Sequence, residues 1–128
     1  MDRLKFGMLV EKAVESLPQE FKDKLENVEI VVEDLPTKRQ TIRLNLGHPL
    51  QLLGLYEGVP QTGRGTGYTL VLPDKITLFQ KSIETKCNYS ERRIEIEIGD
   101  VVKHEIAHHF GIGDAALKRI EKNKRKKH

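Results

Sequence analysis

The spacing of apolar residues in the first part of the chain predicts two helices. Between Asp2 and Leu17 the apolar residues recur every three or four positions, which places them on one stripe of an amphipathic helix. Pro18 suits the first turn of a second, short helix that runs to Glu26. The stripe expected to be buried on the first helix consists of Phe6, Leu9, Val10, Ala13, Val14 and Leu17.

Extended segments are predicted for the middle of the chain. Val28–Glu33 (VEIVVE) is rich in β-branched residues, which favour strands. Thr41–Leu46 alternates in polarity and is expected to form another strand. Three more predicted strands surround or follow a glycine-rich loop at residues 62–67, and they are Leu53–Val59, Tyr68–Leu72 and Lys75–Phe79.

Ser90–Phe110 carries two competing patterns. Ile94, Ile96 and Ile98 alternate with charged residues as in a strand, and Gly99 with the next residue would form a turn. As a helix, the segment places apolar residues on one face, and Ser90 is a suitable N-cap. The residues on that face are Ile94, Ile98, Val101, Val102 and Ala107.

The composition is that of one globular domain. The 128 residues are 38% apolar and 32% charged, and a chain of this length can bury a small core. No apolar run approaches the roughly 20 residues of a membrane span, and the acidic residues near the N-terminus do not fit a signal peptide. The single cysteine, Cys87, cannot form an internal disulfide. A reducing cytoplasm, without a membrane partner, is therefore the expected location.

Charge distinguishes the last eleven residues from the rest of the chain. Residues 118–128 contain seven Lys or Arg and one Glu and so carry +6, whereas the chain carries +3 in total. The expected organisation is one domain over residues 1–117 and a basic tail over residues 118–128. A solvated, fraying terminus is the preferred interpretation of the tail. Docking to an acidic partner or to RNA is the alternative, although the tail has no aromatic residue for base stacking.

The strongest chemical signal lies between His104 and Asp114. These eleven residues read HEIAHHFGIGD and match the pattern H-E-x-x-H-x-x-G-x-x-D. Residues four apart on a helix lie on the same side and one turn apart, so His104 and His108 can hold one ion between their imidazoles. Glu105 projects beside that ion and can take a proton from an attacking water. Zinc is the ion that this spacing favours.

The third ligand is expected after the end of this helix. Gly111 can adopt the left-handed conformation that commonly ends a helix and turns the chain back. Asp114, three residues later, would then offer a carboxylate oxygen to the metal. Two histidines and one carboxylate leave the fourth zinc position for water, as hydrolytic sites need. A helix N-cap is the structural alternative for Asp114, and the two roles are compatible.

Chance does not account for the whole motif. In a chain of this composition H-E-x-x-H is expected roughly 0.02 times, and the longer pattern with Gly and Asp in register roughly 0.00007 times. If the two histidines were ordinary polar residues on a solvated helix face, Glu105 and Gly111 would be coincidences. His109 falls on another face and is expected to pack, or to support the ligands, rather than to bind the metal.

Four segments resemble the bacterial minimal zincin-like family of zinc metallopeptidases. The resemblance implies an α+β, minimal zincin-like fold, in which a small mixed β-sheet packs against helices that include the H-E-x-x-H helix. It also implies His104, His108 and Asp114 as zinc ligands and Glu105 as the general base. The matching segments are Asn27–Pro36 (NVEIVVEDLP), Leu52–Gly65 (LLGLYEGVPQTGRG), Leu72–Gln80 (LPDKITLFQ) and the metal motif.

Two features depart from the resemblance. Residues 37–51 form a longer connection than the family usually has, and the alternation at Arg93–Ile98 is stricter than we expect of the family's helix at this place. The resemblance nevertheless favours helix over the whole of Ser90–Phe110, at the cost of a glycine, Gly99, in the helix interior.

The sequence predicts a zinc-dependent metallopeptidase. Zinc-activated water would attack a peptide bond with Glu105 as general base, while the peptide or protein substrate lies as an added strand along Leu53–Val59. Tyr56 and Tyr68 are candidates for stabilising the oxyanion or lining the cleft. One alternative is a zinc-stabilised protein-binding module without turnover. The other is a metal-dependent RNA hydrolase, which only the basic tail supports.

Overall fold

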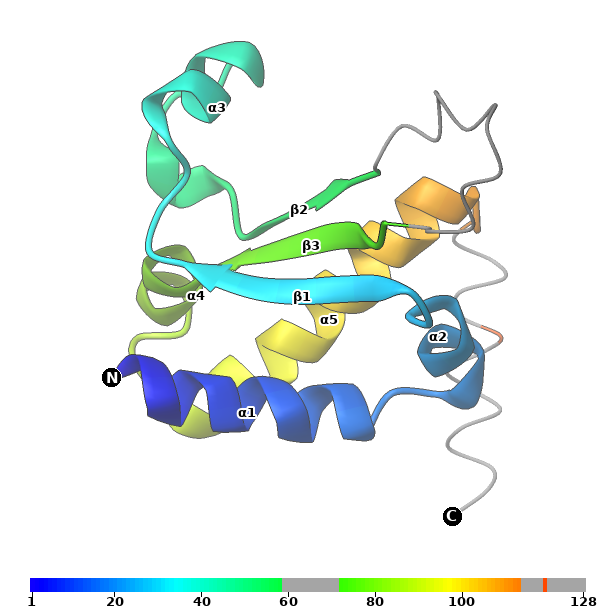
Figure 1. Ribbon diagram of the computed structural model, residues 1–128. Coiled ribbons are helices and arrows are strands. Elements are labelled where there is room, and N and C mark those ends of the chain that lie inside the picture. Colours follow the sequence, from blue (N-terminus) through cyan, green and yellow to red (C-terminus); the bar gives the residue numbers. More distant parts are fainter. Residues whose placement is uncertain (59–71, 114–118, 120–128) are drawn as a thin grey trace.

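The structure is a computed structural model that describes residues 1–58, 72–113 and 119. Within this part of the chain, three strands form one sheet in the order β1-β3-β2. β1 (Val28–Glu33) is parallel to the central strand β3 (Asp74–Phe79), and β2 (Gly54–Glu57) is antiparallel to it. This small mixed sheet, packed against helices, confirms the predicted α+β class (Figure 1).

The strands agree closely with the sequence patterns. β1 has the predicted bounds, while β2 and β3 coincide with the central parts of the predicted Leu53–Val59 and Lys75–Phe79 segments. β2 lies at an edge of the described sheet, as predicted. The predicted strand Tyr68–Leu72 lies outside the described residues except for Leu72, and so does the basic tail except for Arg119.

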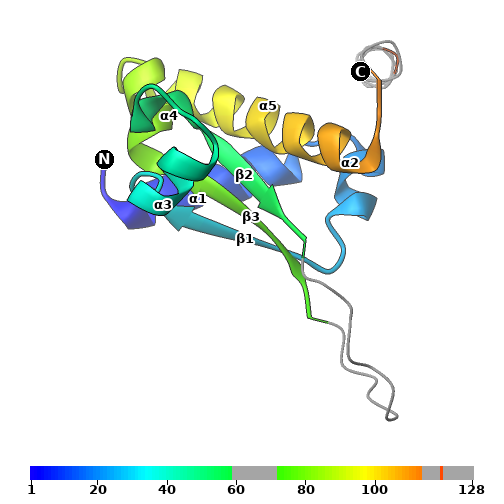
Figure 2. The same ribbon diagram turned by 90° about the horizontal axis from the view of Figure 1, so that it is seen from above.

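Two long helices pack against one face of the sheet (Figure 2). α1 (Arg3–Glu15) begins after Asp2, whose carboxylate accepts a hydrogen bond from the Lys5 backbone N–H. α5 (Glu91–Phe110) begins after Ser90, which caps it as predicted. None of the helices in the described ranges is long and apolar enough to cross a membrane.

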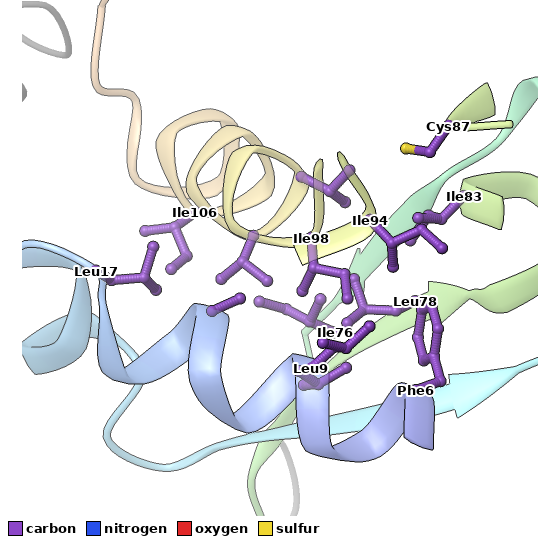
Figure 3. Close-up of a cluster of buried hydrophobic side chains, with 14 of the residues drawn as sticks. Phe6, Leu9, Leu17, Ile76, Leu78, Ile83, Cys87, Ile94, Ile98 and Ile106 are labelled. Atoms are coloured by element: carbon purple, nitrogen blue, oxygen red, sulfur yellow. The ribbon is translucent and has the colours of Figure 1, made fainter. Parts of the chain in front are cut away.

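The core lies between α1, α5 and β3 (Figure 3). Ile94 and Ile98 of α5 are fully buried, whereas Ile96 is 56% exposed. A strand would turn all three side chains to the same face, so their burial agrees with the helix that was preferred for Ser90–Phe110. The other fully buried large apolar side chains are Phe6, Phe21, Ile76, Leu78, Phe79, Ile83, Val102 and Ile106.

Short helices complete the fold. α2 (Gln19–Lys24) follows Pro18, as predicted, and η1 (Pro49–Gln51) is a single 3₁₀ turn before β2. α4 (Gln80–Lys86) follows β3 directly and ends at Cys87, which is buried as a small packed residue.

The prediction of a strand at Thr41–Leu46 was wrong. The first half of the segment instead forms the end of a helix, α3 (Lys38–Arg43). Thr37 and Gln40 form a capping box, in which each side chain accepts a hydrogen bond from the other residue's backbone N–H. This local start signal outweighs the alternation, because two of the alternating apolar residues bury little surface: Ile42 is 70% exposed and Leu44 is 38% exposed.

β2 lies very close to α5 because Gly54 has no side chain. A Cβ built on Gly54 would stand 2.5 Å from Cγ1 of Val101 and 3.3 Å from the carbonyl oxygen of Thr77. The glycine therefore allows the edge strand to pass directly over the helix that carries the metal motif.

Candidate metal and catalytic site

The last two turns of α5 present the two motif histidines together. His104 and His108 are exposed, and their ring centroids lie 4.2 Å apart with the planes tilted by 48°. This is the arrangement expected for residues four apart on one helix face. Both imidazoles therefore face the same solvent-accessible region.

Glu105 is half-buried and is held by the edge strand. Its Oε1 accepts a hydrogen bond of 3.0 Å from the backbone N–H of Tyr56. The carboxylate thus touches the backbone of β2 from the same stretch of α5 that carries the histidine pair.

The helix ends as the motif predicts. Gly111 has the left-handed conformation, with φ 68° and ψ 28°, and the N–H of Ile112 donates to the carbonyl oxygen of Ala107 at 2.8 Å. Ile112 packs against the core, so the chain turns back toward the molecule after the helix. Asp114, the predicted third ligand, lies outside the described residues, as does Tyr68.

Tyr56 is surrounded by residues from two other elements. Its hydroxyl donates to Oδ2 of Asp74 at 2.6 Å, and its ring stacks on that of His109 at a centroid distance of 3.9 Å and an angle of 16°. Burial, together with the adjacent Asp74 carboxylate, raises the pKa of the Tyr56 hydroxyl well above its usual value. The hydroxyl therefore stays protonated and donates to Asp74.

Asp74 is the residue of this cluster that the sequence did not identify. His109 lies on α5 and was expected to pack, whereas Asp74 opens β3, far away along the chain. The segment LPDKITLFQ contributed to the family resemblance, but nothing in it connects Asp74 with Tyr56. Only the pairing of β2 with β3 brings the two together.

A cleft of about 530 Å³ adjoins the motif. One wall is apolar, with Leu52, Leu53 and Val101. His104 and Glu105 also line the cleft, as do Glu97 and Lys86, whose side chains form an ion pair at 3.1 Å. The remaining lining residues are Gln51, Gly54 and Asp100.

The donor chemistry fits zinc. Two neighbouring, exposed imidazoles supply nitrogen ligands, and a half-buried carboxylate lies beside them, which is the arrangement of a hydrolytic zinc site with a separate base. Within residues 1–58 and 72–113, no third His, Cys, Asp or Glu side chain joins the pair in a metal-binding group.

Two further histidines in the described ranges, His48 and His109, have different roles. His48 accepts a hydrogen bond from the Leu50 backbone N–H through Nδ1 and caps the 3₁₀ turn η1, which fits the loop position of this residue. His109 packs on Tyr56, on another side of α5 from the motif pair, as predicted.

The fold and the motif define a small α+β protein of the zincin type. The sequence profile described as "Zincin-like metallopeptidase" matches residues 25–124. Because this match spans most of the chain, the protein belongs to the zincin-like metallopeptidase family, and membership implies zinc binding. Comparison with curated proteins gives no significant match.

Proposed function

We propose that this protein is a zinc-dependent peptidase that uses Glu105 as its general base. The observation that carries the proposal is the position of the Glu105 carboxylate. It lies beside two adjacent imidazoles on one helix and is held by the open edge of a β-strand. Family membership supports the same reaction class.

In this proposal His104, His108 and Asp114 hold the metal and Glu105 moves the protons. Bound zinc would supply a Lewis acid that polarises the scissile carbonyl and acidifies water. Glu105 takes the proton of the attacking water and delivers it to the leaving amine, so that the amine departs uncharged.

The substrate is proposed to be a peptide that adds to the free edge of β2. Edge strands bind extended peptides through their outward main-chain groups, and β2 lies at an edge of the described sheet. Because the Tyr56 N–H at this edge already donates to Glu105, the peptide would pair with the other main-chain groups on this side of β2. A side chain of the bound peptide would enter the cleft next to Leu53 and Gly54. Leu52, Leu53 and Val101 in its lining would contact an apolar side chain, while the rest of the lining is mostly polar or charged.

The test compares the zinc-loaded protein with its Glu105→Gln variant on a pool of peptides, with cleavage followed by mass spectrometry. Gln keeps the size of Glu but cannot take a proton near neutral pH. We expect unchanged zinc content and a rate of hydrolysis lower by about a hundredfold or more. Equal cleavage by the two proteins would exclude Glu105 as the base.

A zinc-stabilised protein-binding module is the second candidate. The hydrogen bond from the Tyr56 hydroxyl to Asp74 favours this candidate, because the hydroxyl that could stabilise an oxyanion already has a partner. In that case neither protein cleaves a peptide, yet both bind the same partner. The Glu105→Gln comparison therefore separates the two functions.

A further inference from the structure

The main-chain N–H and C=O groups of β2 point alternately toward β3 and toward the open edge of the sheet. The Phe79 N–H donates to the carbonyl oxygen of Leu53 at 2.9 Å, so the main-chain groups of Leu53 point toward β3. Because pairing alternates along an antiparallel strand, the main-chain groups of Gly54 and Tyr56 point to the open edge. The Tyr56 N–H at that edge is the group that donates to Glu105.

The side chain of Tyr56 fixes where this N–H lies. Its ring stacks on His109, which is four residues after Glu105 on the same helix. Its hydroxyl donates to Asp74 at the start of β3, the strand that pairs with β2. His109 Nε2 lies 3.9 Å from Oδ2 of Asp74 and closes the cluster. The strand cannot move along or away from α5 without breaking one of these contacts.

From this geometry we infer that Tyr56 positions Glu105, and that Asp74 and His109 hold Tyr56 in place for this task. The inference rests on the proposed role of Glu105 as general base. Tyr56 acts through its backbone N–H, which restrains one carboxylate oxygen, while its side chain acts as the anchor. The competing role for Tyr56 is to stabilise an oxyanion with its hydroxyl. That role predicts full activity in Asp74→Ala, whereas positioning predicts a loss of activity.

The first measurement follows the amide of residue 56 by hydrogen exchange in the zinc-loaded protein, and it needs no catalytic activity. Loosening one hydrogen bond changes an equilibrium by up to about tenfold, so Tyr56→Phe and Asp74→Ala should each speed exchange of this amide about tenfold. The double variant should be no faster than Asp74→Ala alone, because without the Asp74 carboxylate the Tyr56 hydroxyl has no bond to this residue left to lose. Asp74→Asn should restore slow exchange, since its amide oxygen still accepts from the hydroxyl.

Matched controls separate positioning from loss of structure. Tyr89 is 66% exposed, so Tyr89→Phe should leave the residue 56 amide unchanged. Zinc affinity should stay within about twofold in Tyr56→Phe and Asp74→Ala, because neither residue is a proposed ligand. Unchanged exchange in Tyr56→Phe, or additive effects in the double variant, would overturn the inference.

The second measurement is a kinetic comparison on the peptide that the wild type cleaves best. Positioning predicts that Tyr56→Phe and Asp74→Ala lower kcat to a similar extent, about tenfold, with little change in KM. A large loss in Tyr56→Phe with full activity in Asp74→Ala would instead assign the hydroxyl to the oxyanion. A wild type that cleaves no peptide refutes the proposed function, and the exchange pattern then decides whether the cluster holds Glu105.

Discussion

Gly54 and Val101 are in such close contact that the edge strand and the motif helix leave no room for a single methyl group between them. A Cβ on Gly54 would stand 2.5 Å from Cγ1 of Val101, and real carbon atoms do not approach so closely. The separation of β2 from α5 is therefore set by the absence of a side chain at residue 54.

Gly54→Ala should destabilise the protein by about 1–3 kcal/mol, the usual cost of overpacking. Adding Val101→Ala should recover part of this loss, because the smaller side chain makes room for the new methyl group. The two substitutions together should therefore cost less than the sum of their separate effects. Urea unfolding of the four proteins measures this coupling.

Gly7→Ala is the matched control. Nothing lies within 4 Å of a Cβ built on Gly7, inside α1. This substitution should stabilise the protein by about 0.5–1 kcal/mol, since Ala favours helix over Gly. A neutral Gly54→Ala would show that β2 and α5 separate more easily than their contact implies.

Zinc binding should depend on the motif in a graded way. Metal analysis after dialysis is expected to give about one zinc per chain in the wild type, and His104→Ala should lose most of it. Asp114→Ala should weaken binding less, because two imidazoles remain and water can fill the gap. His48→Ala is the control, since His48 caps the turn η1. Full retention of zinc in His104→Ala would rule out the proposed site.

The cleft should govern which peptides are cleaved. Leu53→Trp adds bulk to its apolar wall, so kcat/KM should fall about tenfold for substrates with a large apolar side chain beside the scissile bond. Substrates with alanine at that position should be affected little. Ile96→Trp, at an exposed position of α5 that does not line the cleft, should change neither. An equal loss of kcat/KM for both kinds of substrate would show that the cleft does not determine the side-chain preference.

Cys87 should make stability depend on alkaline pH. Burial and, to a smaller extent, the Glu97 carboxylate raise the pKa of its thiol, while Lys86 and Arg93 oppose the shift. The unfolded chain releases this proton near pH 8.5, whereas the folded chain keeps it to higher pH. The folded state then binds more protons, so stability falls as pH rises above about 8.5.

Cys87→Ala provides the comparison for this effect. At neutral pH the variant should be about 1 kcal/mol less stable than the wild type, a typical cost for a core change. When the pH is raised from about 7.5 to about 9.5, however, its free energy of unfolding should fall by less than that of the wild type. Thermal unfolding at both pH values measures the difference. Parallel losses in the two proteins would mean that the thiol does not contribute.

Local patterns predicted most of the elements, and the one wrong strand arose where two local signals disagreed. The buried row of α5 and the β-branched run of β1 can be read directly from the sequence, because one face of each element meets the core. The alternation at Thr41–Leu46 misled because Ile42 and Leu44 stay exposed, while the start signal at Thr37 and Gln40 decides the local structure.

In the candidate site, some residues are related by spacing along the chain and others only by the fold. His104, Glu105 and His108 share one helix, so their spacing alone brought them together. Asp74 has no such local relation to Tyr56, since the two meet only through the register of β2 against β3. The register of two strands cannot be read from a single sequence, so the cluster around Tyr56 could not be predicted.

α5 carries the core on one side and the histidine pair on the other, within one uninterrupted helix. An ion that binds the histidines only while this helix is intact must favour the folded chain over the unfolded chain. At a free metal concentration one hundred times the Kd, binding raises the free energy of unfolding by about 2.7 kcal/mol. The melting temperature of the whole domain would then rise and fall with the free zinc concentration, and a chelator would act as a denaturant.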